Sequence, residues 1–124
     1  MNRQSIQIDV ETNYLADQSD MEDQRYVFAY TVTIRNTGKL AVQLLTRCWL
    51  VTDAGGKVRE IRGDGVVGEQ PRIRPGEYHR YSSLSIITTP VGTMEGSYGM
   101  IDAEDEKFLV SIPVFRLAMP GILN

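Results

Sequence analysis

Apolar side chains recur at every second position along several stretches of this chain, and this period of two restricts the possible folds more than any other feature. The clearest stretch begins at Tyr26 and continues through Phe28, Tyr30, Val32 and Ile34. Alternate side chains of a strand point to the same face, so this stretch predicts a strand with one apolar face. No window of about eleven residues keeps apolar groups at helical spacing, and we therefore expect little helix.

Further strands are expected on both sides of this one, separated by turn residues. They cover residues 5–11, 42–53, 57–62, 78–85, 94–102 and 107–117, with the central strand over 25–36. The polar stretch from Thr12 to Gln24 is expected to be an exposed loop. Short strands joined by Gly, Pro, Asn and Asp turns predict one all-β domain over residues 1–124. Its fold should be an antiparallel sandwich of about seven strands, of the immunoglobulin or fibronectin type III kind.

Two details of these strands concern their place in the sheets. Pro113 lies inside the last predicted strand, where it cannot donate a ladder hydrogen bond, so we expect an edge position or a bulge there. In the strand over 42–53 both faces carry large apolar groups. The pattern therefore leaves open which face of the strand around Trp49 points inward.

Charge, cysteine content and hydropathy exclude several classes of protein. The net charge of -3 and the pI near 5.1 argue against nucleic-acid binding, which needs clustered basic residues. Cys48 is the single cysteine, so an internal disulfide and a zinc ribbon are excluded. No apolar run approaches the roughly 18 residues of a membrane span, and the N-terminus lacks a secretory signal. We expect a cytoplasmic protein that does not associate with membranes.

The sequence GDGVVG places Gly63, Gly65 and Gly68 at the G-x-G-x-x-G spacing of dinucleotide-binding loops. Such a loop binds a phosphate because it opens directly onto the N-terminus of a helix. Here Pro71 and Pro75 follow, and they prevent a regular helix from continuing through the segment. We therefore interpret the motif as a bend between two sheets, with glycines at positive φ. A phosphate-binding role for the three glycines is the weaker alternative.

A locally basic window overlaps this motif in a chain that is acidic overall. Its basic residues are Lys57, Arg59, Arg62, Arg72, Arg74 and Arg80, against Glu60, Asp64, Glu69 and Glu77. In the simpler interpretation Arg59 and Arg62 lie on solvated strand faces. In the other, backbone amides of the glycine loop and nearby arginines form an anion-binding nest.

Other chemically reactive residues do not assemble into a recognisable site. His79 is the single histidine and is interpreted as a strand residue at a surface. Cys48, beside Trp49, is expected to be a buried, inert thiol. The acidic residues Asp102, Glu104, Asp105 and Glu106 lack the pattern of a calcium loop and are interpreted as a hairpin turn. No catalytic residue, metal ligand or cofactor is predicted.

Several segments together resemble the bacterial ApaG family, also called CorD. They are RYVFAYTVTIRNTG, VQLLTRCWLVTDAGGKV, EIRGDGVVGEQPRIRPGEYHRYSS, TPVGTMEGSYGM and FLVSIPVFRLAMP. The similarity runs from about Ile6 to Pro120. It implies a fibronectin type III-like sandwich, an association with cobalt and magnesium tolerance, and protein recognition by similar eukaryotic domains. It implies no enzymatic reaction.

The chain departs from this family at two places. Many relatives read RHW where this chain has Cys48 between Arg47 and Trp49, so a role for a histidine there is in doubt. Relatives also tend to have a glycine and a cysteine where this chain reads SSLSIITTP. The three glycines of the GDGVVG motif match.

Together these observations predict a non-enzymatic binding module whose ligand is another, unidentified protein. The expected contact surface is the loop and the flanking strands around Gly63 to Arg74, with Glu69, Gln70 and Arg72 as exposed polar members. Association with further copies of the chain stays open. The alternative is a small-ligand sensor for a nucleotide, a dinucleoside polyphosphate or a divalent cation. Its binding would depend on Arg59, Arg62, Arg72 and Arg74.

Overall fold

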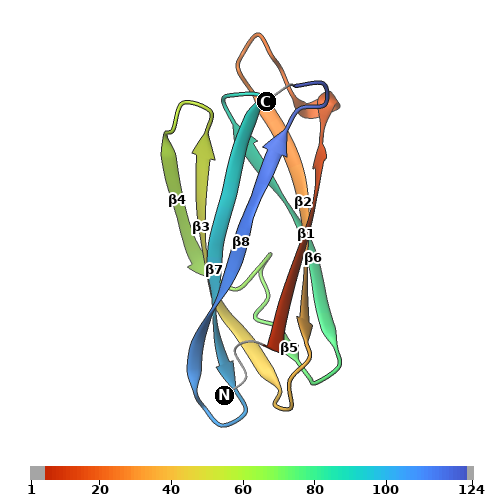
Figure 1. Cartoon of the computed structure of the whole chain (residues 1–124), viewed down its shortest axis with the longest axis vertical. Coiled ribbons are helices and arrows are strands. Elements are labelled where there is room, and N and C mark those ends of the chain that lie inside the picture. The colour runs from red at the N-terminus through yellow and green to blue at the C-terminus, as the bar shows by residue number, and fades with distance from the viewer. Residues whose placement is uncertain (1–4, 123–124) are drawn as a thin grey trace.

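Two antiparallel sheets face each other in a computed structural model that describes residues 5–122 (Figure 1). The strands are β1 (Ile6–Tyr14), β2 (Tyr26–Asn36), β3 (Val42–Asp53), β4 (Val58–Asp64), β5 (Arg72–Ile73), β6 (Tyr78–Ile87), β7 (Val91–Asp102) and β8 (Lys107–Ala118). One sheet has the order β1-β2-β6 and the other β4-β3-β7-β8, with β5 beside β3. The predicted all-β sandwich is confirmed. Among residues 5–122, no helix has the length and hydropathy needed to cross a membrane.

The first connection differs from the predicted loop. β1 continues to Tyr14, and the segment from Thr12 to Tyr14 pairs with β2 opposite Tyr30 to Phe28. The side chain of Tyr14 packs on the ring of Phe28, with 5.2 Å between the centroids. Pairing with β2 therefore overrides the polar local sequence. A short 3-10 helix, η2 (Ala16–Gln18), follows before the chain returns as β2.

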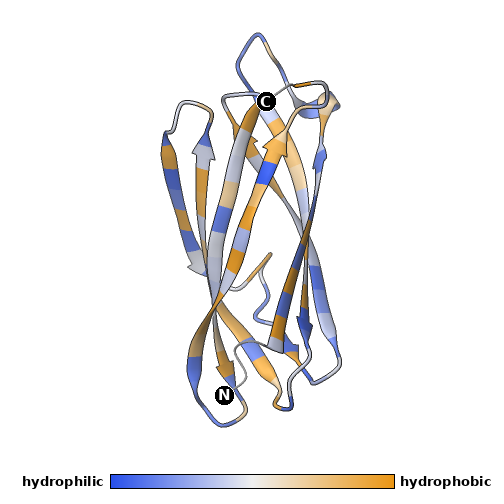
Figure 2. Cartoon of the chain, in the orientation of Figure 1, coloured by the Kyte–Doolittle hydropathy of each residue, from blue (hydrophilic) through white to orange (hydrophobic). Residues whose placement is uncertain are grey.

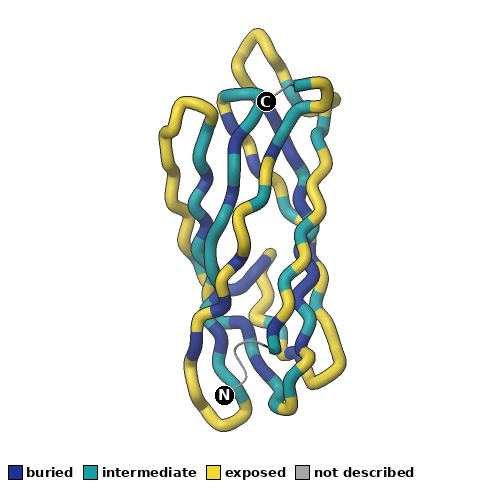
Figure 3. The backbone as a smooth tube through the Cα atoms, viewed as in Figure 1, coloured by how far each residue is buried: buried dark blue, intermediate teal, exposed yellow. Residues whose placement is uncertain are grey.

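The core lies between the sheets and is formed by the alternating apolar residues. Hydrophobic and hydrophilic bands alternate along the strands (Figure 2), and buried and exposed segments alternate in the same way (Figure 3). Trp49 lies at the centre of an aromatic group: its ring centroid is 5.4 Å from that of Tyr30, 5.8 Å from that of Phe115 and 6.3 Å from that of Tyr98.

A β-bulge at Leu45 decides which side of β3 faces this core. Leu44 pairs with Met100 and Thr46 with Gly99, so Leu45 is an extra residue without a partner on β7. An extra residue reverses the alternation of side chains that follow it. Before the bulge Leu44 is buried, and after it Trp49 is buried. Trp49 therefore points inward, which answers the question that the sequence left open.

The two sides of the sandwich are closed differently. On one side β1 lies against β8, and on the other the edge strands β4 and β6 face each other. β8 carries a second bulge, because Met94 pairs with Phe115 and Gly96 with Ile112, and Pro113 lies within it. The prediction for Pro113 is confirmed on both counts, since it lies on an edge strand and in a bulge.

Candidate functional site

A hollow of about 300 Å³ opens between the edge strands β4 and β6. We call it the β4–β6 hollow, and its walls mix cationic, hydroxyl and apolar groups. The lining includes Tyr30, Arg47, Trp49, Arg59, Ile61 and Ser83. Nη2 of Arg59 crosses the opening and donates a hydrogen bond to the carbonyl oxygen of Ile86, at 3.1 Å. A smaller hollow of about 120 Å³ continues from it past Arg59 and Ile86 toward Lys57.

Arg47 enters this hollow because the bulge places it on the inner face of β3, with Trp49. Its Nη1 donates hydrogen bonds to the carbonyl oxygens of Asp64 and Gly65, both at 3.0 Å. Gly63 pairs with Arg47 across the two strands. A Cβ at Gly63 would lie 2.7 to 2.8 Å from three guanidinium atoms, so the missing side chain makes room for the cation. The glycine loop thus holds an arginine of its own chain and presents carbonyl oxygens to it.

The rest of the loop is a tight turn fastened to β3. Gly65 has a φ of +64°, and its N–H donates to the carbonyl oxygen of Leu45 in the bulge, at 2.8 Å. Val66 and Glu69 exchange two backbone hydrogen bonds of 2.8 and 3.0 Å around a turn whose tip is Val67 and Gly68, both at positive φ. Val66 is 1% exposed and fills the core below the turn. The positive φ of Gly65 and Gly68 is confirmed, whereas Gly63 does not have a positive φ. The loop does bend the chain, but it joins β4 to β5 within one sheet and not two sheets as predicted, and the chain changes sheet only after β5.

The segment that follows contains no helix. It runs through the two-residue strand β5 and a turn before β6 begins at Tyr78. The loop therefore lacks the helical N-terminus that binds a pyrophosphate in a dinucleotide fold, as the prolines predicted.

The predicted contact residues Glu69, Gln70 and Arg72 are all exposed on this loop and on β5. Nε2 of Gln70 donates to the carbonyl oxygen of Leu45 at 2.9 Å, and Nε2 of Gln43 donates to the carbonyl oxygen of Gln70 at 3.1 Å. Gln70 thus fastens the loop to β3. None of the three predicted residues lines the β4–β6 hollow, and their role in contacting a partner stays a prediction.

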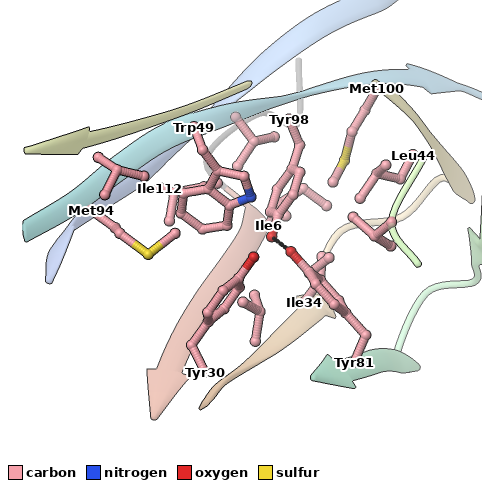
Figure 4. Close-up of a cluster of buried hydrophobic side chains, with 14 of the residues drawn as sticks. Ile6, Tyr30, Ile34, Leu44, Trp49, Tyr81, Met94, Tyr98, Met100 and Ile112 are labelled. Carbon is pink, nitrogen blue, oxygen red and sulfur yellow. Dashed lines mark hydrogen bonds between the residues drawn. The ribbon is translucent and has the colours of Figure 1, made fainter. Parts of the chain in front are cut away.

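A cluster of tyrosine hydroxyls lies below the hollow. The hydroxyls of Tyr81 and Tyr98 are hydrogen-bonded and join β6 to β7 across the core (Figure 4). The hydroxyl of Tyr30 and the indole nitrogen of Trp49 point toward the same place. Burial raises the pKa of all three tyrosines, while the charge of Arg47 acts in the opposite direction on the pKa of Tyr30 and of Tyr81. These hydroxyls therefore stay neutral at physiological pH and can donate hydrogen bonds.

The basic window does not gather into one site. Arg62 faces the outer side of the sheet and is paired with Glu60, while Nε of Arg80 donates to Oγ1 of Thr33. Arg72 and Arg74 are exposed on β5 and just after it. Arg59 alone among the window's arginines lines the hollow, which Arg47 also lines.

Arg47 was not predicted as a site residue. Alternation places Arg47 on the same face of the strand as Trp49. The sequence did not decide whether that face points inward, so Arg47 could not be assigned to the interior. The two arginines also come from different strands and line the same hollow only because β3 and β4 form a hairpin.

The remaining candidates have structural surroundings. His79 is half-buried and stacks on Tyr81, with 6.3 Å between ring centroids, and its Nε2 is buried without a hydrogen-bond partner, so it is less exposed than expected. Cys48 was expected to be buried, but it is half-buried on the outer face of β3, because the bulge turns it away from the core. Oδ1 of Asp102 accepts hydrogen bonds from the backbone N–H groups of Glu104 and Glu106, which confirms the acidic hairpin turn. Within residues 5–122, no three His, Cys, Asp or Glu side chains are grouped to hold a metal ion.

Comparisons with known proteins agree with this architecture. The model of the ApaG domain family matches residues 16–102. The ApaG proteins of Salmonella arizonae and Salmonella enteritidis are each 52% identical over 124 residues, which is all of this chain and 99% of theirs. A Bordetella pertussis protein described as ApaA has a crystal structure with a TM-score of 0.92 and 44% identity, over 94% of this chain and 95% of that one. The X-ray structure of a structural-genomics target has a TM-score of 0.94 and 46% identity, over 99% of this chain and 93% of that one.

Proposed function

This chain belongs to the ApaG family, and the family name specifies no enzymatic activity. We propose that the chain is a non-enzymatic module that binds an extended segment of a partner protein. The segment adds as a further strand to the free edge of β6. The observation that supports this proposal is the unequal protection of the four sheet edges.

Three of the four edges of the described sheets carry features that discourage strand addition. β8 has Pro113 in a bulge, and both features interrupt ladder pairing. β4 carries charges at Arg59, Glu60, Arg62 and Asp64, and inter-strand pairing is discouraged by such charged edges. β1 carries acidic residues and lies against β8.

The edge of β6 is different, because its outward residues after Arg80 are uncharged. Ser82, Leu84 and Ile86 follow at alternate positions, and Leu84 and Ile86 are 50% and 38% exposed. The carbonyl oxygen of Ile86 faces the open side, where it accepts the hydrogen bond of Arg59. Backbone groups of alternate residues in an edge strand face the same side, so those of Leu84 and Ser82 are directed there too. An added strand would find a row of backbone donors and acceptors, with one acceptor held by a displaceable side chain.

The test begins with selection of linear peptides from a random phage-displayed library on the full chain. Backbone amide NMR shifts then map the bound peptide, and we expect the largest shifts along β6. Leu84→Lys should weaken binding about tenfold or more, because it places a charge on the pairing edge. Leu109→Lys is the matched control, since Leu109 is 71% exposed on β8 and outside the proposed surface.

The shifts could instead be confined to the glycine loop, with binding lost when Glu69, Gln70 and Arg72 are replaced by alanine. That result would show that the contact surface is the glycine loop and not β6. Equal binding by the two lysine variants would overturn strand addition to β6. We further propose that the module acts in the cytoplasm and that it contributes to cobalt and magnesium tolerance through its partner.

A second candidate function is the sensing of a small anionic ligand, supported by the two arginines in the hollow. A volume of about 300 Å³ is at the lower end of the range for small-molecule pockets. Calorimetric titration with nucleotides, dinucleoside polyphosphates and divalent cations tests it. Saturable heats that weaken in Arg59→Gln would support this function, and flat titrations would eliminate it.

A further inference from the structure

We propose that the β4–β6 hollow binds one carboxylate group through the guanidinium groups of Arg47 and Arg59, which line it from β3 and β4. This inference rests on the proposed function, because the carboxylate belongs to the captured segment of the partner. It assigns the chemistry of that segment, which must carry an acidic group beside apolar residues.

The two guanidinium groups lack an acidic partner of their own. In the part of the chain that the structure describes, the ion pair joins Arg62 to Glu60 on the outer face of β4. Arg47 and Arg59 donate instead to backbone carbonyl oxygens, and each uses one terminal nitrogen for this. An arginine has five N–H donors in a planar fork, so both retain donors that suit a planar carboxylate.

Arg47 is also positioned in advance. Its guanidinium lies in the space left by Gly63 and is fixed by the carbonyl oxygens of Asp64 and Gly65. A side chain that is already held loses little freedom when it binds, which favours affinity. The glycine loop therefore contributes to anion binding through Arg47 and not through its own amides.

The surrounding walls complete the site. The hydroxyls of Tyr30 and Ser83 and the indole N–H of Trp49 supply neutral donors, and no protein group of the described chain accepts from that N–H. Ile61, Leu84, Ile86 and Met94 supply apolar surface. In an extended segment alternate side chains share one face, so we expect the pattern apolar-x-acidic-x-apolar in the partner.

Trp49 makes this site directly observable, since it is the single tryptophan of the chain. Sodium acetate is titrated into the full chain at constant ionic strength, with sodium chloride as the reference salt. We expect a saturable shift of the Trp49 indole N–H resonance at millimolar acetate. Arg59→Gln should weaken the acetate response about tenfold or more, which is the usual effect of losing a hydrogen bond from a charged group. Arg59 is exposed, so this variant should fold normally.

Three further variants separate the effect of the position of the Arg47 guanidinium from the effect of charge. Gly63→Ala keeps every charge but displaces the Arg47 guanidinium, and it should weaken the response as Arg47→Gln does. Arg62→Gln removes a positive charge from the opposite face of the same strand and should leave the response unchanged. An equal loss in Arg62→Gln and Arg59→Gln would show general charge screening and would overturn the proposal, as would a titration without saturation.

The outcomes for the two proposals are distinguishable. An acetate response without peptide binding at β6 would support the carboxylate site and overturn strand addition. Peptide binding at β6 that is unchanged in Arg59→Gln would support strand addition and overturn the carboxylate site.

Two sets of peptides identify the source of the carboxylate group. One set has an internal aspartate and an amidated end, and the other carries only a free C-terminal carboxylate. Replacing the aspartate by phosphoserine should weaken binding, and tighter binding would overturn the assignment to a carboxylate.

Discussion

The three glycines of the GDGVVG motif each meet a different requirement of the chain. Gly63 leaves space for the guanidinium of Arg47, whereas Gly65 allows the backbone to pass close to Glu69. Gly68 completes a turn at positive φ with nothing within 4 Å of its missing Cβ. Local needs of the backbone and of one arginine are therefore sufficient to explain the spacing that this motif shares with phosphate-binding loops.

These different roles predict different costs for an added methyl group. In Gly65→Ala the Cβ would lie 2.2 Å from the carbonyl oxygen of Glu69, at a φ of +64°. We expect the free energy of unfolding to fall by about 3 kcal/mol or more, from the contact and the backbone strain together. Gly68→Ala has the strain alone and should cost about 1 to 2 kcal/mol. Urea unfolding of both variants measures the difference, and equal costs would contradict the assigned roles.

At the scale of elements, the bulge at Leu45 organises the site. It sets the inward direction of both Trp49 and Arg47, and its carbonyl oxygen accepts hydrogen bonds from Gly65 and Gln70. One irregular residue of β3 thus orients the arginine and also fastens the loop that holds it.

Deletion of Leu45 should therefore have a larger effect than loss of its side chain. The deletion would reverse the faces of β3 after residue 44 and direct Trp49 toward solvent, because side chains alternate with a period of two. We expect loss of the cooperative unfolding transition and a red-shifted tryptophan emission spectrum. Leu45→Ala keeps the bulge, and it should cost about 1 kcal/mol and leave the emission unchanged. A cooperative, blue-emitting deletion variant would show that the bulge is dispensable.

The same bulge marks the limit of prediction from the sequence. Regular alternation was sufficient to predict β2 and the sandwich, and Pro113 was sufficient to predict an irregular edge. β3 was ambiguous because its two halves have opposite faces buried, so apolar residues occur on both sides of the pattern. Strand β5 has two residues, too few to show a period. The hollow joins Arg47 to Arg59 and Ser83 from different strands, and a linear pattern does not contain that juxtaposition.

At the scale of the whole molecule, the two sheets are joined by a polar contact inside the core. The hydroxyls of Tyr81 and Tyr98 meet between β6 and β7, and both residues are buried. Burial raises the pKa of both hydroxyls above the ordinary value of 10.0. The folded protein therefore keeps these protons at a pH where the unfolded chain releases them.

This difference predicts the direction of alkaline destabilisation. Stability from the two hydroxyls is fully present below pH 10 and falls as the pH rises above it, by up to about 1.4 kcal/mol per pH unit for each group. The Tyr81→Phe, Tyr98→Phe double variant removes both hydroxyls together and leaves neither unpaired. We expect its free energy of unfolding to decline less steeply between pH 10 and 11. Parallel slopes for the two proteins, measured by urea unfolding, would contradict this assignment.

Within the described sheets, β6 is the edge that lacks the protecting features of the other edges, and this also limits stoichiometry. A second copy of the chain that paired edge to edge through β6 would form a closed dimer with two-fold symmetry, in which neither copy could accept another strand. Self-association by this route and capture of a partner would then compete for the same backbone groups. The concentration of the protein itself would regulate its availability, without a separate inhibitor.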